Sequence, residues 1–199
     1  CVVPSVGAAW KRACGRCCPG GRPLVVGPGL KSGIAMRYDD PSEVGSDRVA
    51  DVVAAREAYG APAVVVDLGT TTNFEVVDAQ GAFAGGVIAP GVALGARALA
   101  DAAARLPEIE LRAPERVIGR NTRAAMQSGL VLGEVARIDG LLDGILAELA
   151  AGGASRDIPV ILTGNDAQHM AALLKHQAAV DETLTLRGLA LLWQRNQRR

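Results

Sequence analysis

The fold of this chain is decided around Val64–Asn73, which reads Val-Val-Val-Asp-Leu-Gly-Thr-Thr-Thr-Asn. The three valines predict a buried strand, and Gly69 predicts a tight turn after it. Because Phe74–Val77 resumes a strand, the stretch predicts a hairpin with Asp67 at its mouth and hydroxyl groups at its tip. Such a tip suits phosphate, and the carboxylate suits a cation or a proton. An ordinary hairpin that ends in an aspartate is the open alternative.

Composition narrows the class of protein. The 199 residues allow one large domain or two small ones, with enough length for a hydrophobic core. Lysine plus arginine and aspartate plus glutamate both number 21, so no basic field favours nucleic acid or an anionic membrane. Charged residues or proline interrupt every apolar run before it reaches the length of a membrane span. The start resembles no signal peptide, and we therefore expect a cytoplasmic protein with no nucleic-acid or membrane partner.

The cysteines and histidines give little support for a metal site. Four cysteines occur, at positions 1, 14, 17 and 18, and Cys14 and Cys17 form a C-x-x-C pair. A structural zinc site needs four ligands, usually as two spaced pairs, and no second pair exists. We expect reduced thiols near a helix end. The only histidines, His169 and His176, lie far away in sequence, and we assign them no catalytic role.

Hydrophobic periodicity predicts an alternation of strands and helices. The chain contains no solenoid repeat, and strands followed by helices favour a layered α/β fold. We divide the chain into a first part, 1–62, and a second part, 63–199, that opens with an antiparallel meander. The expected strands cover 1–6, 24–26, 63–67, 74–78, 83–88 and 160–163, and the expected helices cover 6–18, 48–59, 91–106, 123–149, 167–175 and 184–194.

Three loops combine polar side chains with a strand end or a helix start: Tyr38–Arg48, Asp67–Asn73 and Gly119–Thr122. In α/β sheets the loops at the carboxyl ends of strands gather at the ligand site. In the first loop Asp47 can act as a general base toward a hydroxyl, and Arg48 can clamp a carboxylate. The alternative is a helix cap, which also remains open for the third loop. Neither a P-loop nor a dinucleotide-binding glycine motif is present.

Six ordered motifs resemble type III pantothenate kinase over nearly the whole chain. The resemblance implies a ribonuclease-H-like (actin-like ATPase) fold of two domains with ATP between them. Residues 1–62 would be the remainder of a partial N-terminal domain, and 63–199 a complete C-terminal domain. The motifs are Pro28–Gly33, Tyr38–Arg48, Asp67–Phe74, Gly85–Gly91, Ile118–Thr122 and Leu184–Leu189.

The same resemblance implies an enzyme that transfers phosphate from ATP to pantothenate, the first step of coenzyme A biosynthesis. Asp47 would be the catalytic proton acceptor, and Thr122 would reach pantothenate from the neighbouring subunit of a homodimer. Asp67 would hold a monovalent cation, potassium or ammonium, and Thr70 would contact the phosphates of magnesium-bound ATP. The pantothenate pocket would be formed by Tyr38, Gly45, Ser46, Asp47, Arg48 and Thr122.

Two departures from the family pattern fall on the ATP side. The family begins with an Asp-x-Gly-Asn-Thr phosphate loop, which these 199 residues lack, so we expect a truncated form of doubtful activity. The family's Thr-Gly-Gly turn reads Thr163-Gly164-Asn165 here, where a side chain would crowd the nucleotide. Some proteins of this kind are known as transcription accessory factors. A non-catalytic fragment or such a factor is therefore the alternative.

Overall fold

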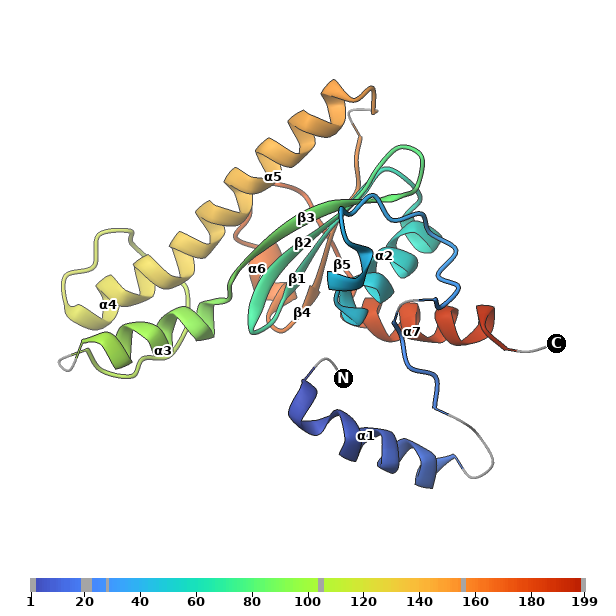
Figure 1. Cartoon of the computed structure of the whole chain (residues 1–199). Coiled ribbons are helices and arrows are strands. Elements are labelled where there is room, and N and C mark those ends of the chain that lie inside the picture. Colours follow the sequence, from blue (N-terminus) through green and yellow to red (C-terminus); the bar gives the residue numbers. More distant parts are fainter. Residues whose placement is uncertain (1–2, 19–22, 28, 104–105, 155–156, 198–199) are drawn as a thin grey trace.

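A five-stranded sheet with helices on both faces forms the body of the protein (Figure 1). The computed structural model describes residues 3–18, 23–27, 29–103, 106–154 and 157–197. The strands lie in the order β3-β2-β1-β4-β5. Their bounds are β1 Ala63–Leu68, β2 Thr71–Val77, β3 Phe83–Pro90, β4 Val160–Gly164 and β5 Ala179–Val180.

The strand directions identify the fold class. β2 runs antiparallel to both of its neighbours, whereas β1, β4 and β5 run parallel to one another. The register of the first hairpin pairs Val66 with Phe74 and Asp67 with Asn73. A sheet in the order 3-2-1-4-5 with its second strand reversed has ribonuclease-H-like topology. The predicted α/β class and the predicted meander are confirmed.

A different set of helices covers each face of the sheet. α2 and α7 pack on one face against Val65, Val77 and Ile161, while α5 and α6 pack on the other against Val64, Val66 and Leu162. Successive strand residues point to opposite faces, which explains why the run of valines feeds two separate cores. The helices are α1 Pro4–Cys17, α2 Ser46–Tyr59, α3 Val92–Ala102, α4 Thr122–Gln127, α5 Gly133–Ala151, α6 Ala167–Ala171 and α7 Leu184–Arg195, with short turns η1 Pro41–Glu43 and η2 Ser128–Leu132.

α2 and α7, which lie far apart in the sequence, cross in close contact. A Cβ atom at Gly188 of α7 would overlap the backbone of Ala50 in α2. Glycine at 188 therefore lets the two helices cross in direct contact. The predicted boundary at residue 62 stays a prediction, since α2, which precedes it, packs against the sheet that follows it.

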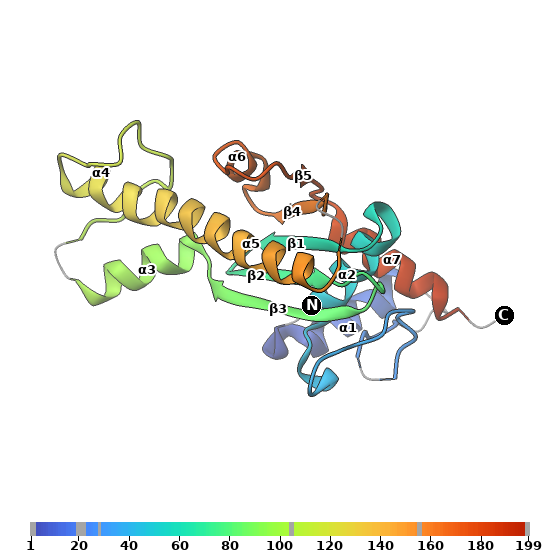
Figure 2. The same cartoon turned by 90° about the horizontal axis from the view of Figure 1, so that it is seen from above.

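An arm of helices extends beyond the edge of the sheet. Figures 1 and 2 show α3 and α4 lying side by side at the far end of α5, away from α2 and α7. α4, the π-helical turn η2 and α5 follow one another without a break, so the predicted helix over 123–149 is confirmed with a π segment inside it. π segments inside α-helices are frequently found at functional sites.

Several local predictions need correction. Residues 24–26 form no strand, and Val25 is 63% exposed, because no neighbouring strand pairs with it among the described residues. The strand expected over 1–6 is wrong where it can be checked, since α1 begins at Pro4, a residue type that favours the first helical turn; residues 1–2 lie outside the described part. No described helix is long and apolar enough to span a membrane.

Candidate functional site

The amino end of α2 presents the predicted base. Gly45 is the N-cap of the helix, and Asp47 lies in its first turn. The Asp47 Oδ1 atom accepts a hydrogen bond from the backbone N–H of Arg48 at 2.9 Å. A Cβ at position 45 would lie 2.5 Å from that Oδ1 atom. Glycine at 45 therefore leaves room for the Asp47 carboxylate. The alternative of a side-chain cap is wrong, because Gly45 is the N-cap and no described side chain caps the helix, whereas the role of base stays a prediction.

Arg48 lies at the centre of a buried network. Its side chain is 7% exposed, and its Nε donates to Glu75 Oε1 at 2.9 Å. One terminal nitrogen donates to the Tyr38 hydroxyl at 2.9 Å, and the other to the carbonyl of Phe74 at 3.3 Å. Burial acts to lower the pKa of Arg48, but the charge of Glu75 and the hydrogen bonds to Tyr38 and Glu75 together outweigh burial and raise that pKa. The guanidinium is thus engaged inside the protein.

Gly86 in β3 makes room for this network. A Cβ there would overlap the Phe74 carbonyl and would lie 2.7 Å from an Arg48 terminal nitrogen. The second glycine of the Gly-Gly pair is therefore required by the close approach of the guanidinium to β2 and β3. The structure thus gives the physical reason for the second glycine of the Gly85–Gly91 motif, which the sequence alone does not reveal.

Four carboxylates gather on this face of the sheet. Burial, followed by the charge of Asp47, raises the pKa of Asp67, so these two groups lie close enough to interact. Burial, followed by the charge of Asp51, raises the pKa of Glu75 well above its usual value. Burial is also the main cause that raises the pKa of Asp51 to about 7. The site is therefore rich in carboxyl groups whose protonated forms are favoured by burial, and Arg48 is a buried cation among them.

Asp51 and Glu75 were not found by sequence reasoning. Both are fully buried, and three of their four carboxylate oxygens have no hydrogen-bond partner of ordinary geometry among the described residues. The Thr185 hydroxyl lowers the pKa of Asp51, but less than burial raises it. A glutamate inside the strand run Phe-Glu-Val-Val was the one available signal for Glu75. The sequence contains no comparable signal for Asp51, because a polar residue at one position of a helix turn is usual and does not indicate burial.

The hairpin tip is open and shaped by glycine. Gly69 and Thr70 are exposed between β1 and β2. The N–H of Gly91 donates to the Thr70 carbonyl at 3.0 Å, and a Cβ at Gly91 would overlap the Gly69 carbonyl. The start of α3 is thus held against the tip. The Thr70 side chain remains accessible there to an anionic ligand.

The turn after β4 meets the end of β1. Gly164 has φ 85°, and a Cβ there would overlap the Leu68 carbonyl and lie 2.6 Å from Asp67 Oδ1. The next N–H, of Asn165, donates to the Leu68 carbonyl at 2.7 Å. Gly164, the first glycine of the expected Thr-Gly-Gly turn, therefore has to be glycine to leave room for the Asp67 carboxylate. Asn165 stands at the second glycine position, and its side chain is exposed.

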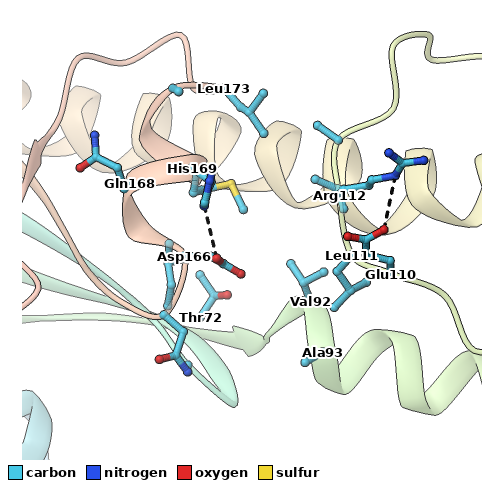
Figure 3. A pocket seen from close by; sticks show the side chains of 17 residues that line it. Thr72, Val92, Ala93, Glu110, Leu111, Arg112, Asp166, Gln168, His169 and Leu173 are labelled. Carbon is cyan, nitrogen blue, oxygen red and sulfur yellow. Dashed lines mark ion pairs between the residues drawn. The ribbon is translucent and has the colours of Figure 1, made fainter.

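A pocket of about 820 Å³ opens beside this turn (Figure 3). One wall comes from the ends of β1 and β4 and from α6, and the opposite wall from the start of α3 and the segment at 110–113. His169 and Asp166 form an ion pair on the first wall, and Arg112 and Glu110 form one on the second. The pocket lies on the α5–α6 side of the hairpin tip. Asp47 and Arg48 do not line it.

Thr122 is not part of the α2 site within one chain. It begins α4 in the arm and lines a shallow hollow with Leu99 and Met126. The cap of α4 is Asn121, whose side chain accepts from the N–H of Ala124 at 2.9 Å, so the cap expected at Thr122 is wrong by one residue. Tyr38, Gly45, Ser46, Asp47 and Arg48 lie together around the start of α2, and Asp67 and Thr70 lie on the adjoining hairpin.

The match to known sequences decides the family. The family model for type III pantothenate kinase matches residues 1–144. The chain belongs to the type III pantothenate kinase family. A type III pantothenate kinase of Acidobacterium capsulatum is 42% identical over 97% of the chain and 69% of its own length. The corresponding enzyme of Brevibacillus brevis is 42% identical over 98% of the chain and 74% of its own length.

The chain spans only part of its relatives. It covers 62% of the type III pantothenate kinase of Koribacter versatilis, to which it is 43% identical over 88% of the chain. Among solved structures, a Campylobacter jejuni protein named as a Baf family transcriptional activator superposes with a TM-score of 0.54. That match covers 82% of this chain and 68% of the other, at 22% identity, and therefore supports the fold alone.

Proposed function

We propose that the chain is the larger part of an enzyme that transfers the terminal phosphoryl group of ATP to the primary hydroxyl of pantothenate. The product would be 4′-phosphopantothenate, made in the cytoplasm as the first step toward coenzyme A. The observation that carries this proposal is the packing of α2, with Asp47 in its first turn, on the sheet face where Asp67 lies near the end of β1, next to the proposed phosphate site. A base and a phosphate site on adjoining elements are what phosphoryl transfer to an alcohol needs.

Asp47 would accept the proton of the pantothenate hydroxyl as its oxygen bonds to the phosphorus and the bond to ADP breaks. A carboxylate within hydrogen-bond reach of the hydroxyl also orients it for in-line attack. Tyr38, Gly45 and Ser46 would line the pantothenate pocket. Arg48, which is engaged with Glu75 and Tyr38, would shape this pocket from behind.

ATP would lie with its phosphates at Thr70 and its nucleoside toward the pocket of Figure 3. Asp67 and Asn73 fit a monovalent cation, potassium or ammonium. They face each other across β1 and β2, and the Asn73 Oδ1 atom is buried without a hydrogen-bond partner among the described residues. Such a cation, with the magnesium that accompanies ATP, would offset the charge of the carboxylates and the phosphates.

The arm would join two copies of the chain. Val117 and Ile118 are 73% and 82% exposed on it, next to the loop that carries Thr122. Apolar side chains exposed to this extent are typical of interaction surfaces. In a homodimer the arm would bring Thr122 to the pantothenate pocket of the other subunit.

The alternative is a non-catalytic fragment or a transcription accessory factor. The name of the Campylobacter jejuni protein points that way, but its similarity to this chain concerns the fold alone. The equal numbers of basic and acidic residues disfavour direct binding to nucleic acid. The proposal of a kinase therefore has the stronger support.

A coupled assay of ADP release tests the proposal. The chain is compared with a version extended by the segment of a curated relative that the match does not cover, with ATP, magnesium, potassium and pantothenate. We expect pantothenate-dependent ADP release from the extended version. Absence of release at any pantothenate concentration, in an extended version that is folded, would refute the kinase assignment.

A further inference from the structure

Two clusters in this molecule have the same chemistry. Each consists of a buried carboxylate, an arginine and a tyrosine. In the first, Arg48 pairs with Glu75 and donates to the Tyr38 hydroxyl. In the second, which we use below as a control, Arg187 pairs with Asp181, and the Tyr59 hydroxyl donates to that aspartate at 3.3 Å. Tyr38 and Tyr59 are the only tyrosines of the chain.

The two clusters differ in their central residue, which is the arginine, Arg48, in the first and the carboxylate, Asp181, in the second. No hydrogen bond joins Glu75 to Tyr38, and the two residues are linked through Arg48, which donates to both. The Arg48 guanidinium lies 5.7 Å from the centre of the Tyr38 ring and 5.4 Å from that of Phe83. The two rings are 5.4 Å apart. The arginine thus holds both the ring and the hydroxyl of Tyr38.

The ring of Tyr38 packs against the buried cluster of this face, and its hydroxyl accepts a hydrogen bond from Arg48. Tyr38 lies in a segment without regular secondary structure, between the bridge residue Met36 and the turn η1. Its ring is half-buried beside the start of α2. A side chain on such a segment takes its position from its neighbours: Phe83 and the buried cluster hold the ring, and Arg48 holds the hydroxyl.

The charge of Glu75 accounts for the position of Arg48. A guanidinium with 7% of its side chain exposed needs a partner, because an unpaired buried charge is costly. Glu75 supplies it from β2 at a fixed point of the sheet, so the direction of the guanidinium fork is set by the sheet and not by the loop. An arginine neutralised in this way is a poor clamp for a substrate carboxylate.

We propose that Glu75 is a positioning residue of the pantothenate pocket, which fixes the Arg48 guanidinium and through it the hydroxyl of Tyr38. This inference rests on the proposed function, since it assigns Glu75 to the same pocket. Glu75 touches neither substrate nor reacting atoms. Its effect on binding passes through two hydrogen bonds, each 2.9 Å long.

The first test measures pantothenate binding by calorimetry in the chain, in E75Q, in Y38F and in the double variant. E75Q removes the negative charge that strengthens the hydrogen bond from Arg48, and Y38F removes the hydroxyl itself. We expect about a tenfold weaker affinity for each variant, the effect of one well-placed hydrogen bond. The double variant should bind only as weakly as Y38F, because both changes remove the same contact. Independent, multiplying losses would overturn the proposal, as would tighter binding by E75Q, which would mean that a released Arg48 clamps the substrate.

Asp181→Asn is the matched control. It removes the same kind of buried carboxylate from an arginine and a tyrosine elsewhere in the molecule. We expect it to lower the melting temperature as E75Q does but to leave pantothenate affinity unchanged. An equal loss of affinity in D181N would show that E75Q acts through general stability, and would overturn the positioning role.

A second test needs no ligand. Incorporation of fluorotyrosine gives one fluorine resonance for Tyr38 and one for Tyr59. We expect E75Q to shift and broaden the Tyr38 resonance alone, and D181N to shift the Tyr59 resonance alone. If E75Q does not fold, Arg48→Lys serves instead, because a single ammonium cannot hold Glu75 and Tyr38 in the fork geometry of arginine. An unchanged Tyr38 resonance would refute the inference.

The two tests separate this inference from the proposed function. If the unmodified chain and its extended version bind no pantothenate, the proposed function fails, while the fluorine spectra still decide whether Glu75 positions Tyr38. If they bind pantothenate and E75Q binds it equally well, only the role of Glu75 fails.

Discussion

The two faces of the sheet bury different kinds of side chain. The face covered by α2 and α7 contains Arg48, Asp51 and Glu75 among its valines and alanines. The face covered by α5 and α6 is apolar at its centre, and its buried Glu134 lies toward one end, hydrogen-bonded to the Thr72 hydroxyl at 2.5 Å. Burial of charge lowers stability unless something compensates for it. The α2–α7 face is therefore the one where we expect the proton transfer, while the α5–α6 side carries the pocket proposed for the nucleoside.

The largest effect should come from Asp47→Asn on the charged face. Loss of a general base lowers turnover by a factor of at least about 100, and the neutral side chain keeps the size of the original. Pantothenate affinity should change little, because the amide still accepts a hydrogen bond. The measurement is kcat for ADP release in the extended version. Asp143→Asn on α5, where the carboxylate is 53% exposed, is the control and should keep normal turnover.

Asp51→Asn should stabilise the protein at alkaline pH. Burial raises the pKa of Asp51 to about 7, so the native state keeps a proton that the unfolded chain releases near pH 4. Stability therefore falls as pH rises from about 4 to about 7 and then levels off. Between pH 5 and pH 8 the loss amounts to about 3 kcal/mol, and the asparagine variant should lack it. Urea unfolding at the two pH values measures the difference.

Asp139→Asn on the opposite face gives the contrast. Asp139 is also buried, but both of its oxygens lie 3.2 Å from the backbone N–H of Lys175, which donates to them. Replacement by an amide removes a charge-assisted hydrogen bond, so this variant should be less stable at both pH values. If the two asparagine variants change stability in the same direction at pH 8, the distinction between the faces is wrong.

Gly188→Ala should separate α7 from α2. The new methyl group would overlap the Ala50 carbonyl, and overpacking of this kind costs roughly 1–3 kcal/mol. Gly140→Ala in α5 is the matched change on the other face, since a Cβ there meets nothing within 4 Å. It should stabilise the protein by about 0.5–1 kcal/mol, as alanine usually does inside a helix. Thermal melting of both variants tests the pair.

Asn165→Gly should have the smallest effect. The side chain is exposed on the wall of the pocket, and its backbone hydrogen bond to Leu68 does not depend on it. If the side chain crowds the nucleotide, glycine should tighten ATP binding by about two- to threefold, a change of well under 1 kcal/mol. Equilibrium titration with a fluorescent ATP analogue measures it. Weaker binding by the variant would mean that Asn165 contacts the nucleotide instead.

Most of the helices and strands, and the motif residues of the candidate site, could be predicted from the sequence. The hairpin over Val64–Val77 and the helix that ends at Gly60 follow from local patterns, because alternation and glycine act within a few residues. The strand expected at 24–26 was wrong for the same reason, since three apolar residues in a row do not reveal whether a neighbouring strand will pair with them. Tyr38, Asp47 and Asp67 were named from motifs, and the structure brings them to adjoining elements.

The sequence by itself determined the order of elements, the family and the candidate base, because each rests on residues close together in the chain. Only the tertiary structure decided which polar groups are buried together. Arg48 and Glu75 are 27 positions apart, and they meet because β2 pairs with β1 and α2 packs across that face. Gly86 and Gly188 owe their identity to contacts with Arg48 and Ala50 that no local pattern contains. The hairpin around Asp67 could be predicted from its own ten residues. The charged groups around it could not, because Arg48 and Glu75 come close to each other only in the folded chain.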